Sequence, residues 1–171
     1  MLVGLMGAGK TTVGRRCAEL LDRPFVDTDE LVEATTGTSV ADLFAEQGER
    51  RFRTLEREAI ADVSASPTPL VIACGGGAVL DGDNRRALRA HGLVVWLRAS
   101  PTELERRVGA DAGAQRPLLA GGAPPAATLA RLSTQREPSY EAAAHVQVET
   151  DGRAVDEIAA TVVEELQSWN G

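Results

Sequence analysis

Short apolar runs alternate with longer helical patterns along the whole chain. The apolar runs are rich in β-branched residues and predict strands at Met1–Leu5, Pro24–Val26, Leu70–Ala73, Leu93–Leu97 and Val146–Val148. Helical spacing of apolar residues falls between them, at Thr12–Leu21, within Ser39–Ala65, at Asp83–Ala90 and at Pro101–Val108. This alternation is typical of an α/β fold with a central parallel sheet of five strands and helices on both faces.

Two helix boundaries are marked by the residues around them. Ser100 is placed to cap a helix, Pro101 to occupy its first position, and Glu103 to complete a capping box. Val155–Trp169 carries apolar residues four apart and predicts an amphipathic helix. No repeat or linker rich in proline, glycine or serine divides the chain, so we expect residues 1–171 to form one domain.

Two segments stand outside this regular pattern. Gly109–Pro125 is rich in alanine, glycine and proline, and long loops without regular structure are uncommon unless they have a role. This segment is either a mobile lid or an ordinary surface loop. Only Met1, Leu2 and Val3 precede the first glycine, so we expect an unusually short first strand and an assigned start that lacks a few residues.

The composition is that of an ordinary globular protein. The 171 residues are 43% hydrophobic and 25% charged, enough to bury one core. No apolar run approaches the roughly 18 residues of a membrane span, and we find no secretory leader. Cys17 and Cys74 form no secreted-type disulfide framework, which indicates buried free thiols and a cytoplasmic location.

The charge balance argues against nucleic acid as the main partner. The chain has 25 acidic and 18 basic residues, a net charge of −7. No long exposed apolar stripe is evident, so we expect a monomer. Lys10 is the only lysine, and the other basic residues are all arginine. A single retained lysine calls for a chemical explanation, which its neighbours supply.

The segment Gly4–Thr11 fits the pattern G-x-x-x-x-G-K-[ST] of a P-loop, between an apolar strand and an amphipathic helix. Glycines let backbone N–H groups point at phosphate oxygens, and the following helix adds the positive end of its dipole. Lys10 can reach the β- and γ-phosphates, and the Thr11 hydroxyl can bind Mg²⁺. We therefore predict an ATP site that includes Gly7, Ala8, Gly9, Lys10, Thr11 and Thr12.

A phosphate cradle alone does not distinguish a kinase from a switch GTPase or a motor ATPase. Guanine-selective GTPases resemble one another in an Asn-Lys-x-Asp element, and this chain has no second lysine with which to build one. The length also excludes most multi-domain motor ATPases. A small kinase is therefore favoured.

Two acids, in Asp27-Thr28-Asp29, close the second apolar run. Ligands of an open parallel sheet bind at the carboxyl ends of its strands, so these acids are expected to face the phosphate site. Residues two apart in extended backbone point the same way, so both carboxylates can serve one site. One could hold Mg²⁺ through water while the other receives an acceptor hydroxyl. The alternative is that Asp29 only caps the next helix.

A second group of candidates lies on a predicted helix and after the third strand. Arg53 and Glu56 are three apart and form a cluster in which the guanidinium could bind a planar carboxylate, although their spacing alone favours a solvated helix face. The glycines of Cys74-Gly75-Gly76-Gly77 would let backbone N–H groups approach a ligand. The alternative there is a plain strand-to-helix turn.

Two arginines remain open from the residues alone. Arg116 lies within Gly109–Pro125, and an arginine on a closing lid can stabilise the charge that develops during phosphoryl transfer. Arg136 opens Arg136-Glu137-Pro138-Ser139-Tyr140. Each is as readily an ordinary surface residue. His91 and His145 have no paired ligand nearby, so we interpret them as structural or solvated.

Taken together, these motifs resemble the shikimate kinase family over nearly the whole chain. The P-loop is shared with many proteins, but its combination with Asp27-Thr28-Asp29, Phe52-Arg53-x-x-Glu56, Gly75-Gly76-Gly77 and Arg116-Pro117-Leu118 is much more specific. The resemblance implies a three-layer P-loop kinase fold with a mobile lid. It also implies ATP-dependent phosphorylation of the 3-hydroxyl of shikimate, on the route to chorismate and the aromatic amino acids.

The resemblance implies roles on the nucleotide side. Lys10 would steady the transferred phosphate, and one Mg²⁺ ion would be held by Thr11 directly and by Asp27 through water. Arg116 would join the catalytic group as the lid closes. Arg107 and Arg153 are similar to adenine-contacting positions.

The resemblance also implies roles on the acceptor side. Asp29 would bind the acceptor hydroxyl and act as catalytic base. Arg53 and Arg136 would clamp the substrate carboxylate, and the backbone of Gly75–Gly77 would add contacts.

Two rival functions remain open at this stage. The first is another small P-loop kinase, for gluconate or a nucleoside monophosphate; a clamp of Arg53 and Arg136 favours an acid, which leaves gluconate as the closer competitor. The second is a non-catalytic nucleotide-binding module. Retention of Lys10, Thr11 and both acids argues against it, because binding alone does not require them all.

Overall fold

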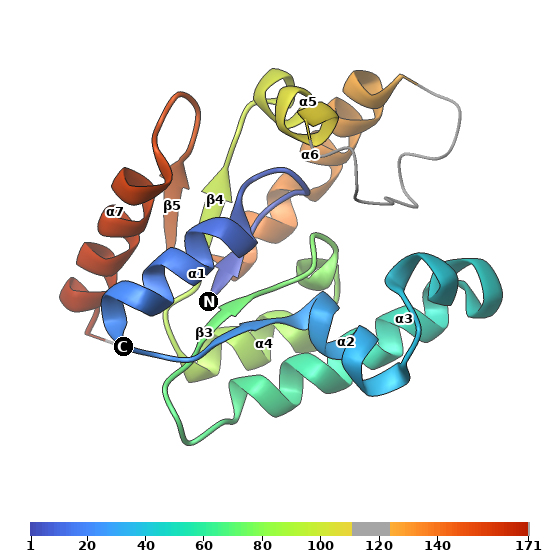
Figure 1. The fold of residues 1–171 in the computed structure, drawn as a ribbon, viewed down its shortest axis with the longest axis horizontal. Coiled ribbons are helices and arrows are strands. Elements are labelled where there is room, and N and C mark those ends of the chain that lie inside the picture. Colours follow the sequence, from blue (N-terminus) through green and yellow to red (C-terminus); the bar gives the residue numbers. More distant parts are fainter. Residues whose placement is uncertain (111–123, 171) are drawn as a thin grey trace.

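A computed structural model describes residues 1–110 and 124–170 of the chain. Its described strands form a single parallel sheet in the order β2-β3-β1-β4-β5 (Figure 1). The strands are β1 (Leu2–Val3), β2 (Phe25–Asp27), β3 (Val71–Ala73), β4 (Val95–Arg98) and β5 (Val146–Glu149). The prediction of a parallel sheet of five strands is confirmed, and β1 is as short as the sequence indicates.

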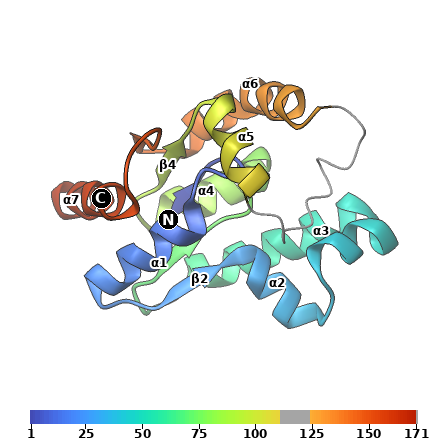
Figure 2. The ribbon, with the colours of Figure 1, turned by 45° about the horizontal axis from the view of Figure 1, so that its top comes forward.

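Helices cover both faces of this sheet, which confirms the three-layer arrangement. They are α1 (Lys10–Leu21), α2 (Thr28–Thr36), α3 (Val40–Ser64), α4 (Gly82–His91), α5 (Pro101–Ala110), α6 (Pro125–Ala143) and α7 (Val155–Ser168), with a short 3₁₀ turn, η1 (Ala78–Leu80). Figure 2 shows α2 and α3 on one side of the first turn of α1, and α5 and α6 on the other. These four helices therefore flank the end of α1 at which the P-loop enters it.

Side chains of the strands alternate between two hydrophobic clusters. Leu2 of β1 and Val95 of β4 pack with α1 and α7, whereas the next residues, Val3 and Trp96, pack with α3 and α4. The two clusters lie on opposite faces of the sheet, because successive residues of a strand point to opposite faces. A smaller cluster joins α2 to α3. A strand covered on both faces has no polar side, which explains the short continuous apolar runs in the sequence.

The helix α3 contains a sharp bend. Gly48, inside it, has φ of 79° and ψ of 163°, far from helical values. A residue with a side chain rarely adopts such a φ. The bend separates a first segment, which packs on α2, from the segment that carries Arg53 and Glu56.

The helix α6 was not predicted. It places Pro138 inside its span and Arg136 among its buried residues, so neither its composition nor its apolar pattern is typical of a helix. The predicted lid, 109–125, overlaps the ends of α5 and α6; its central part, with Arg116, lies outside the described residues. Among the helices that the structure describes, none has the length and apolar character needed to cross a membrane.

Candidate active site

The P-loop connects β1 to α1 at the carboxyl edge of the sheet. Gly4 has φ of 148°, and a Cβ there would lie 2.4 Å from the Leu97 carbonyl oxygen, so this turn requires glycine. The helix begins at Lys10, two residues earlier than predicted, and its N-cap is Gly9. Lys10 Nζ donates to the Leu5 carbonyl oxygen at 3.0 Å. The loop thus folds its lysine back over its own backbone, at the positive end of the helix dipole.

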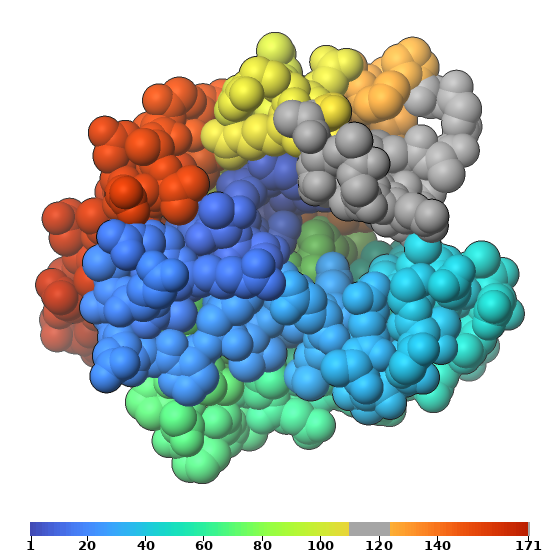
Figure 3. Space-filling model, viewed as in Figure 1, coloured from blue at the N-terminus to red at the C-terminus, as the bar shows by residue number. Residues whose placement is uncertain are grey.

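A cavity of about 870 Å³ opens beside the P-loop. Figure 3 shows the dark blue atoms of the first residues recessed between α5, in yellow, and α1, in blue. All the nucleotide and metal residues predicted from the sequence that the structure describes line this cavity, together with Asp29 and Gly76: Gly7, Ala8, Gly9, Lys10, Thr11, Thr12, Asp27, Arg107 and Arg153. The structure therefore brings them together around one space.

The pair Thr11 and Asp27 forms the oxygen-rich corner of this cavity. Thr11 Oγ1 donates to Asp27 Oδ2 at 2.7 Å, and Asp27 Oδ1 accepts the backbone N–H of Asp29 at 3.0 Å. Hydroxyl and carboxylate oxygens suit Mg²⁺, which usually keeps several waters and takes only one or two protein carboxylates. Among the described residues, no group of three or more His, Cys, Asp or Glu side chains is arranged so that it could hold a metal ion by itself. The donor set thus fits a hydrated Mg²⁺ ion that arrives with a nucleotide.

One geometric expectation about the two acids is wrong. We expected Asp27 and Asp29 to point the same way in extended backbone, but β2 ends at Asp27 and α2 begins at Thr28. The cap of α2 is Asp27, not Asp29. Asp29 reaches the cavity from the first turn of the helix, because the strand-to-helix turn redirects its side chain.

The carboxyl group of Asp29 faces that of Glu56 across Gly75. A Cβ on Gly75 would lie 2.6 Å from Asp29 Oδ1 and 2.5 Å from Glu56 Oε1. Both oxygens are buried, and neither has a hydrogen-bond partner among the described residues. Burial raises the pKa of Asp29 to about 7; the charges of Glu56 and Asp27 act in the same direction, while Lys10 and Arg53 oppose them. A carboxyl group with this pKa can exchange a proton near neutral pH.

Arg53 is held by acids of its own helix and lies against Gly77. Its Nη1 donates to Glu56 Oε2 at 2.8 Å and its Nη2 to Glu49 Oε1 at 2.9 Å. A Cβ on Gly77 would lie 2.5 Å from both terminal nitrogens. Glu56 is only 1% exposed, so the solvated helix face that the spacing alone favoured is wrong. Burial raises the pKa of Glu56, although Arg53 opposes this effect.

Arg136 reaches the same glycine segment from α6. Its Nη1 donates to the Gly76 carbonyl oxygen at 2.9 Å, and Arg136 as a whole is only 4% exposed. Tyr140 Oη donates to the same oxygen at 2.6 Å. The three glycines therefore form a strip that Asp29, Arg53 and Arg136 approach from three helices. The interpretation of this segment as a plain turn does not account for that convergence.

Arg107, on α5, and Arg153, after β5, also line the cavity. Arg107 donates to Glu103 Oε1 at 2.7 Å, to Thr150 Oγ1 at 3.0 Å and to the Gly7 carbonyl oxygen at 3.4 Å. It thus ties the P-loop to α5 and to the segment after β5. Arg153 Nη2 donates to Thr161 Oγ1 at 2.7 Å.

The predicted capping box at the start of α5 is only half formed. The Glu103 N–H donates to Ser100 Oγ at 3.3 Å, as predicted. The Glu103 carboxylate, however, binds Arg106 and Arg107, and the Ser100 N–H donates to Asp151 instead. Arginines compete better than a backbone N–H for this carboxylate.

Sequence reasoning missed two side chains that hold the glycine strip. Thr28 Oγ1 accepts the Gly75 N–H at 3.0 Å and is fully buried. Tyr140 holds the next residue of the strip, as described above. The only signals were their positions, between the two aspartates and four residues after Arg136.

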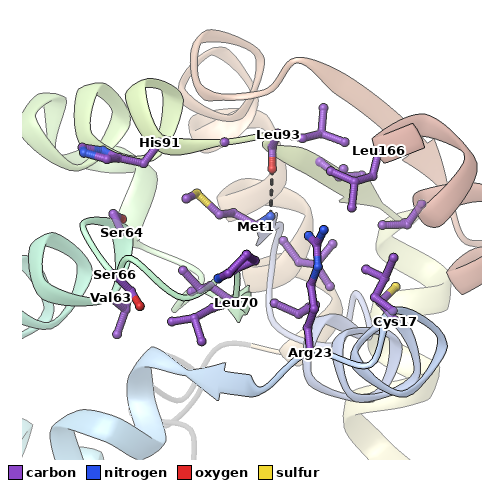
Figure 4. Close-up of a pocket in the computed structure, with 18 of the residues that line it drawn as sticks. Met1, Cys17, Arg23, Val63, Ser64, Ser66, Leu70, His91, Leu93 and Leu166 are labelled. Atoms are coloured by element: carbon purple, nitrogen blue, oxygen red, sulfur yellow. Dashed lines mark hydrogen bonds between the residues drawn. The ribbon is translucent and has the colours of Figure 1, made fainter. Parts of the chain in front are cut away.

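A second cavity, of about 320 Å³, lies at the opposite edge of the sheet (Figure 4). The Met1 amine donates to the Leu93 carbonyl oxygen at 2.8 Å inside it. Cys17 and His91 are among its lining residues, and none of the described site residues is. Both cysteines are free and buried, as predicted. The phosphate and acceptor residues therefore share one edge of the sheet and leave the other without predicted chemistry.

Comparison with known proteins agrees with this geometry. The sequence model described as "Shikimate kinase" matches residues 6–167. The chain is 50% identical to the shikimate kinase of Symbiobacterium thermophilum, over 98% of this chain and 95% of that one. It is 49% identical to that of Salinispora tropica, over 98% and 97%.

A solved structure gives the same result. The structure of shikimate kinase from Acinetobacter baumannii in complex with shikimate superposes with a TM-score of 0.91 at 38% identity, covering 98% of this chain and 91% of that one. Identity at this level over nearly the full length leaves no ambiguity about ancestry. This chain belongs to the shikimate kinase family.

Proposed function

We propose that this protein transfers the γ-phosphoryl group of ATP to the 3-hydroxyl of shikimate, giving shikimate 3-phosphate and ADP. The observation that carries the proposal is the convergence of Asp29, Arg53 and Arg136 on the glycine strip beside the P-loop cavity. The family to which the chain belongs supports the choice of acceptor. The reaction would serve the synthesis of aromatic amino acids.

The nucleotide is held by the P-loop and its surroundings. Backbone N–H groups of Gly7–Thr12 bind the phosphates, and the Lys10 ammonium neutralises charge that moves onto the bridging oxygen. Arg107 and Arg153 border the adenine end of the cavity. Thr11, directly, and Asp27, through water, would hold one Mg²⁺ ion, which supplies further positive charge on the phosphate oxygens.

The acceptor is held by two arginines that bind its carboxylate. Each guanidinium has five N–H donors in a planar fork that matches a carboxylate. Arg53 and Arg136 already have protein partners that fix their orientation, so little side-chain freedom is lost when the substrate binds. The clamp fixes one end of the ring and thereby presents a hydroxyl at the other end to the nucleotide.

Asp29 is the proposed base. Its buried Oδ1 lacks a hydrogen-bond partner among the described residues and is available for the acceptor hydroxyl. A base with a pKa of about 7 accepts a proton effectively near neutral pH. The hydroxyl proton passes to Asp29 as the oxygen attacks phosphorus and the bond to the ADP oxygen breaks. We also propose that Arg116, outside the described residues, adds positive charge during the transfer.

We also propose a cellular compartment and an oligomeric state for this enzyme. Two buried free thiols favour a reducing compartment, so we place the protein in the cytoplasm. We also propose that the protein is a monomer. Size-exclusion chromatography with light scattering would test the monomer directly: a mass of about 18 kDa is expected, and a mass of twice that would contradict it.

The decisive experiment measures ADP release from MgATP by the purified protein with shikimate, gluconate or AMP offered separately. Release with shikimate alone is expected. Release only with gluconate, which is also an acid, would keep the kinase and the carboxylate clamp but change the acceptor. Release only with AMP would keep the kinase and discard the clamp. Nucleotide binding without release for any acceptor would favour the non-catalytic module. ³¹P NMR of the product distinguishes phosphorylation at the 3-hydroxyl from hydrolysis of ATP.

A further inference from the structure

The Gly76 carbonyl oxygen accepts two hydrogen bonds from one face of α6. Arg136 Nη1 lies 2.9 Å from it and Tyr140 Oη lies 2.6 Å from it. Residues four apart on a helix lie above one another, so the two donors reach the same atom from adjacent turns. A carbonyl oxygen has two lone pairs, and these two donors use both. The position of this oxygen therefore couples the phenol to the guanidinium.

The phenol is the more rigid of the two donors. Tyr140 is 2% exposed, and its ring stacks on Trp96 of β4 with centroids 5.4 Å apart and planes 18° apart. Both rings belong to the hydrophobic cluster between the sheet and α3, α4 and α6. Arg136, in contrast, has several rotatable bonds. The Tyr140 hydroxyl is thus a hydrogen-bond donor held in place by packing on the central sheet. It lies one helical turn from Arg136, a member of the proposed substrate clamp.

We propose that Tyr140 is a positioning residue for the acceptor: its hydroxyl fixes the Gly76 carbonyl, and that carbonyl orients Arg136 toward the substrate carboxylate. This inference rests on the proposed function, because it assigns Arg136 to that carboxylate. One N–H of Arg136 is used on Gly76, and a guanidinium has five, so donors remain for a ligand. Without the Tyr140 hydroxyl, the Gly76 carbonyl can rotate, and Arg136 is then no longer held in one orientation.

A simpler role for the hydroxyl has to be separated from this one. A buried phenol needs a hydrogen-bond partner in any case, and the Gly76 carbonyl could be no more than that partner. The two roles differ in what Tyr140→Phe does. The ring and its stacking on Trp96 remain in that variant, so a packing role predicts altered stability and unaltered substrate recognition. A positioning role predicts weaker acceptor binding.

The test compares steady-state kinetics of the wild-type enzyme and of Tyr140→Phe, with each substrate varied in turn. We expect KM for shikimate to rise roughly 5- to 10-fold, and KM for ATP to stay within about twofold, as for the loss of one ordinary hydrogen bond. The matched control is Thr134→Val, which removes an exposed hydroxyl that donates to the Ala130 carbonyl on the same helix. That control should leave both KM values unchanged.

A double-mutant cycle makes the test specific to Arg136. In the background of Arg136→Ala, Tyr140→Phe should change KM for shikimate by less than about twofold, because the group that it positions is absent. Additive effects of the two changes would overturn the inference, as would an unchanged KM for shikimate in Tyr140→Phe alone. Wild-type enzyme that does not phosphorylate shikimate would overturn the proposed function itself, and the inference with it.

A measurement without mutation covers the case in which a variant does not fold. Tyr140 is the only tyrosine in the chain, so growth on 3-fluorotyrosine labels this one position. We expect its ¹⁹F resonance to shift when shikimate is added and to change much less with a non-hydrolysable ATP analogue. A resonance that responds to neither ligand, or to the nucleotide alone, would contradict the positioning role. Burial raises the pKa of Tyr140 to about 12, so the phenol stays protonated and remains a hydrogen-bond donor at the near-neutral pH of these experiments.

Discussion

The guanidinium of Arg53 lies directly against the backbone of Gly77, with no space for even one methyl group between them. A Cβ built on Gly77 would lie 2.5 Å from Nη1 and Nη2 of that arginine and 2.7 Å from its Cζ. The same guanidinium donates to Glu56 and Glu49, which hold it in place. Glycine at this position therefore sets where one half of the proposed carboxylate clamp can lie.

Gly77→Ala should displace Arg53 and weaken acceptor binding while the fold is kept. The obstructing atoms are the far end of a long side chain, which can move, so we expect only a small change in stability. KM for shikimate should rise roughly 10- to 100-fold, the cost of a charge-assisted hydrogen bond. KM for ATP should change little.

Gly82→Ala is the matched control for this substitution. A Cβ on Gly82 would lie 3.6 Å from the nearest side-chain atoms, which is ordinary contact distance. Kinetics with both substrates, together with thermal unfolding, separate the two variants. An unchanged KM for shikimate in Gly77→Ala, with normal folding, would remove Arg53 from the acceptor site.

Lys10→Ala should lower kcat by a factor on the order of 10²–10³ or more, because a charge that acts on the transferred phosphate is lost. Lys10 contacts the Leu5 carbonyl at the surface of the cavity, so the free energy of unfolding should change by only about 1 kcal/mol. Arg15→Ala is the control: it removes a cation from the exposed side of the same helix, where Arg15 pairs with Glu30. Substantial turnover in Lys10→Ala would refute the role given to the lysine.

Arg136→Ala should raise KM for shikimate far more than KM for ATP, because its guanidinium lies at the glycine strip and does not line the cavity beside the P-loop. Arg131→Ala is the control on the same helix, since Arg131 is exposed and bonds only Gln135 among the described residues. Circular dichroism would establish folding before kinetics are compared, because Arg136 is buried. Equal loss of affinity for both substrates would argue against the clamp.

The sheet and the phosphate site could be predicted from local sequence because their signals are local. Apolar runs such as Leu70–Ala73 lie on strands buried on both faces, and the P-loop motif specifies its own backbone. The helix α6 could not be predicted for the opposite reason. Its buried positions include Leu129, Leu132, Arg136 and Tyr140, which follow helical spacing, but an arginine interrupts the apolar stripe. The residue that interrupts the stripe is Arg136, which is itself proposed to bind the substrate.

The same distinction applies to Glu56 and Thr28. Their burial depends on the glycine strip, which approaches them from a distant part of the chain, so spacing along α3 favoured solvent for Glu56. The error over Asp29 is different: the turn from β2 into α2 occurs within one residue, and a periodicity argument places a boundary no better than a few residues.

The pKa of Asp29 links its proposed role to the stability of the fold. Burial and the nearby Glu56 raise that pKa from 3.8 to about 7, so the folded state binds a proton that the unfolded state releases between these values. Stability contributed by the protonated group is therefore present at low pH and is lost as pH rises toward 7. Burial and the neighbouring negative charges therefore destabilise the ionised form of Asp29, which is the form that the proposed base requires.

Asp29→Asn should consequently abolish activity and stabilise the protein, and the gain should depend on pH. We expect kcat to fall at least about 100-fold, because the proposed base is lost. The advantage of the variant in free energy of unfolding should be larger at pH 8 than at pH 5, by up to 2–3 kcal/mol on the order-of-magnitude conversion of two pKa units. Urea unfolding of both proteins at the two pH values measures this difference.

The control for this prediction is Asp62→Asn, which removes the same charge from an exposed position of α3. It should show no comparable pH-dependent gain. A stability advantage of Asp29→Asn that is equal at pH 5 and pH 8 would mean that Asp29 of the folded protein does not titrate between these values, and the buried pair with Glu56 would then not tune the base. An advantage that appears only above pH 5 would instead mean that Asp29 of the folded protein releases its proton near neutral pH, as expected for the base of a kinase that works at that pH.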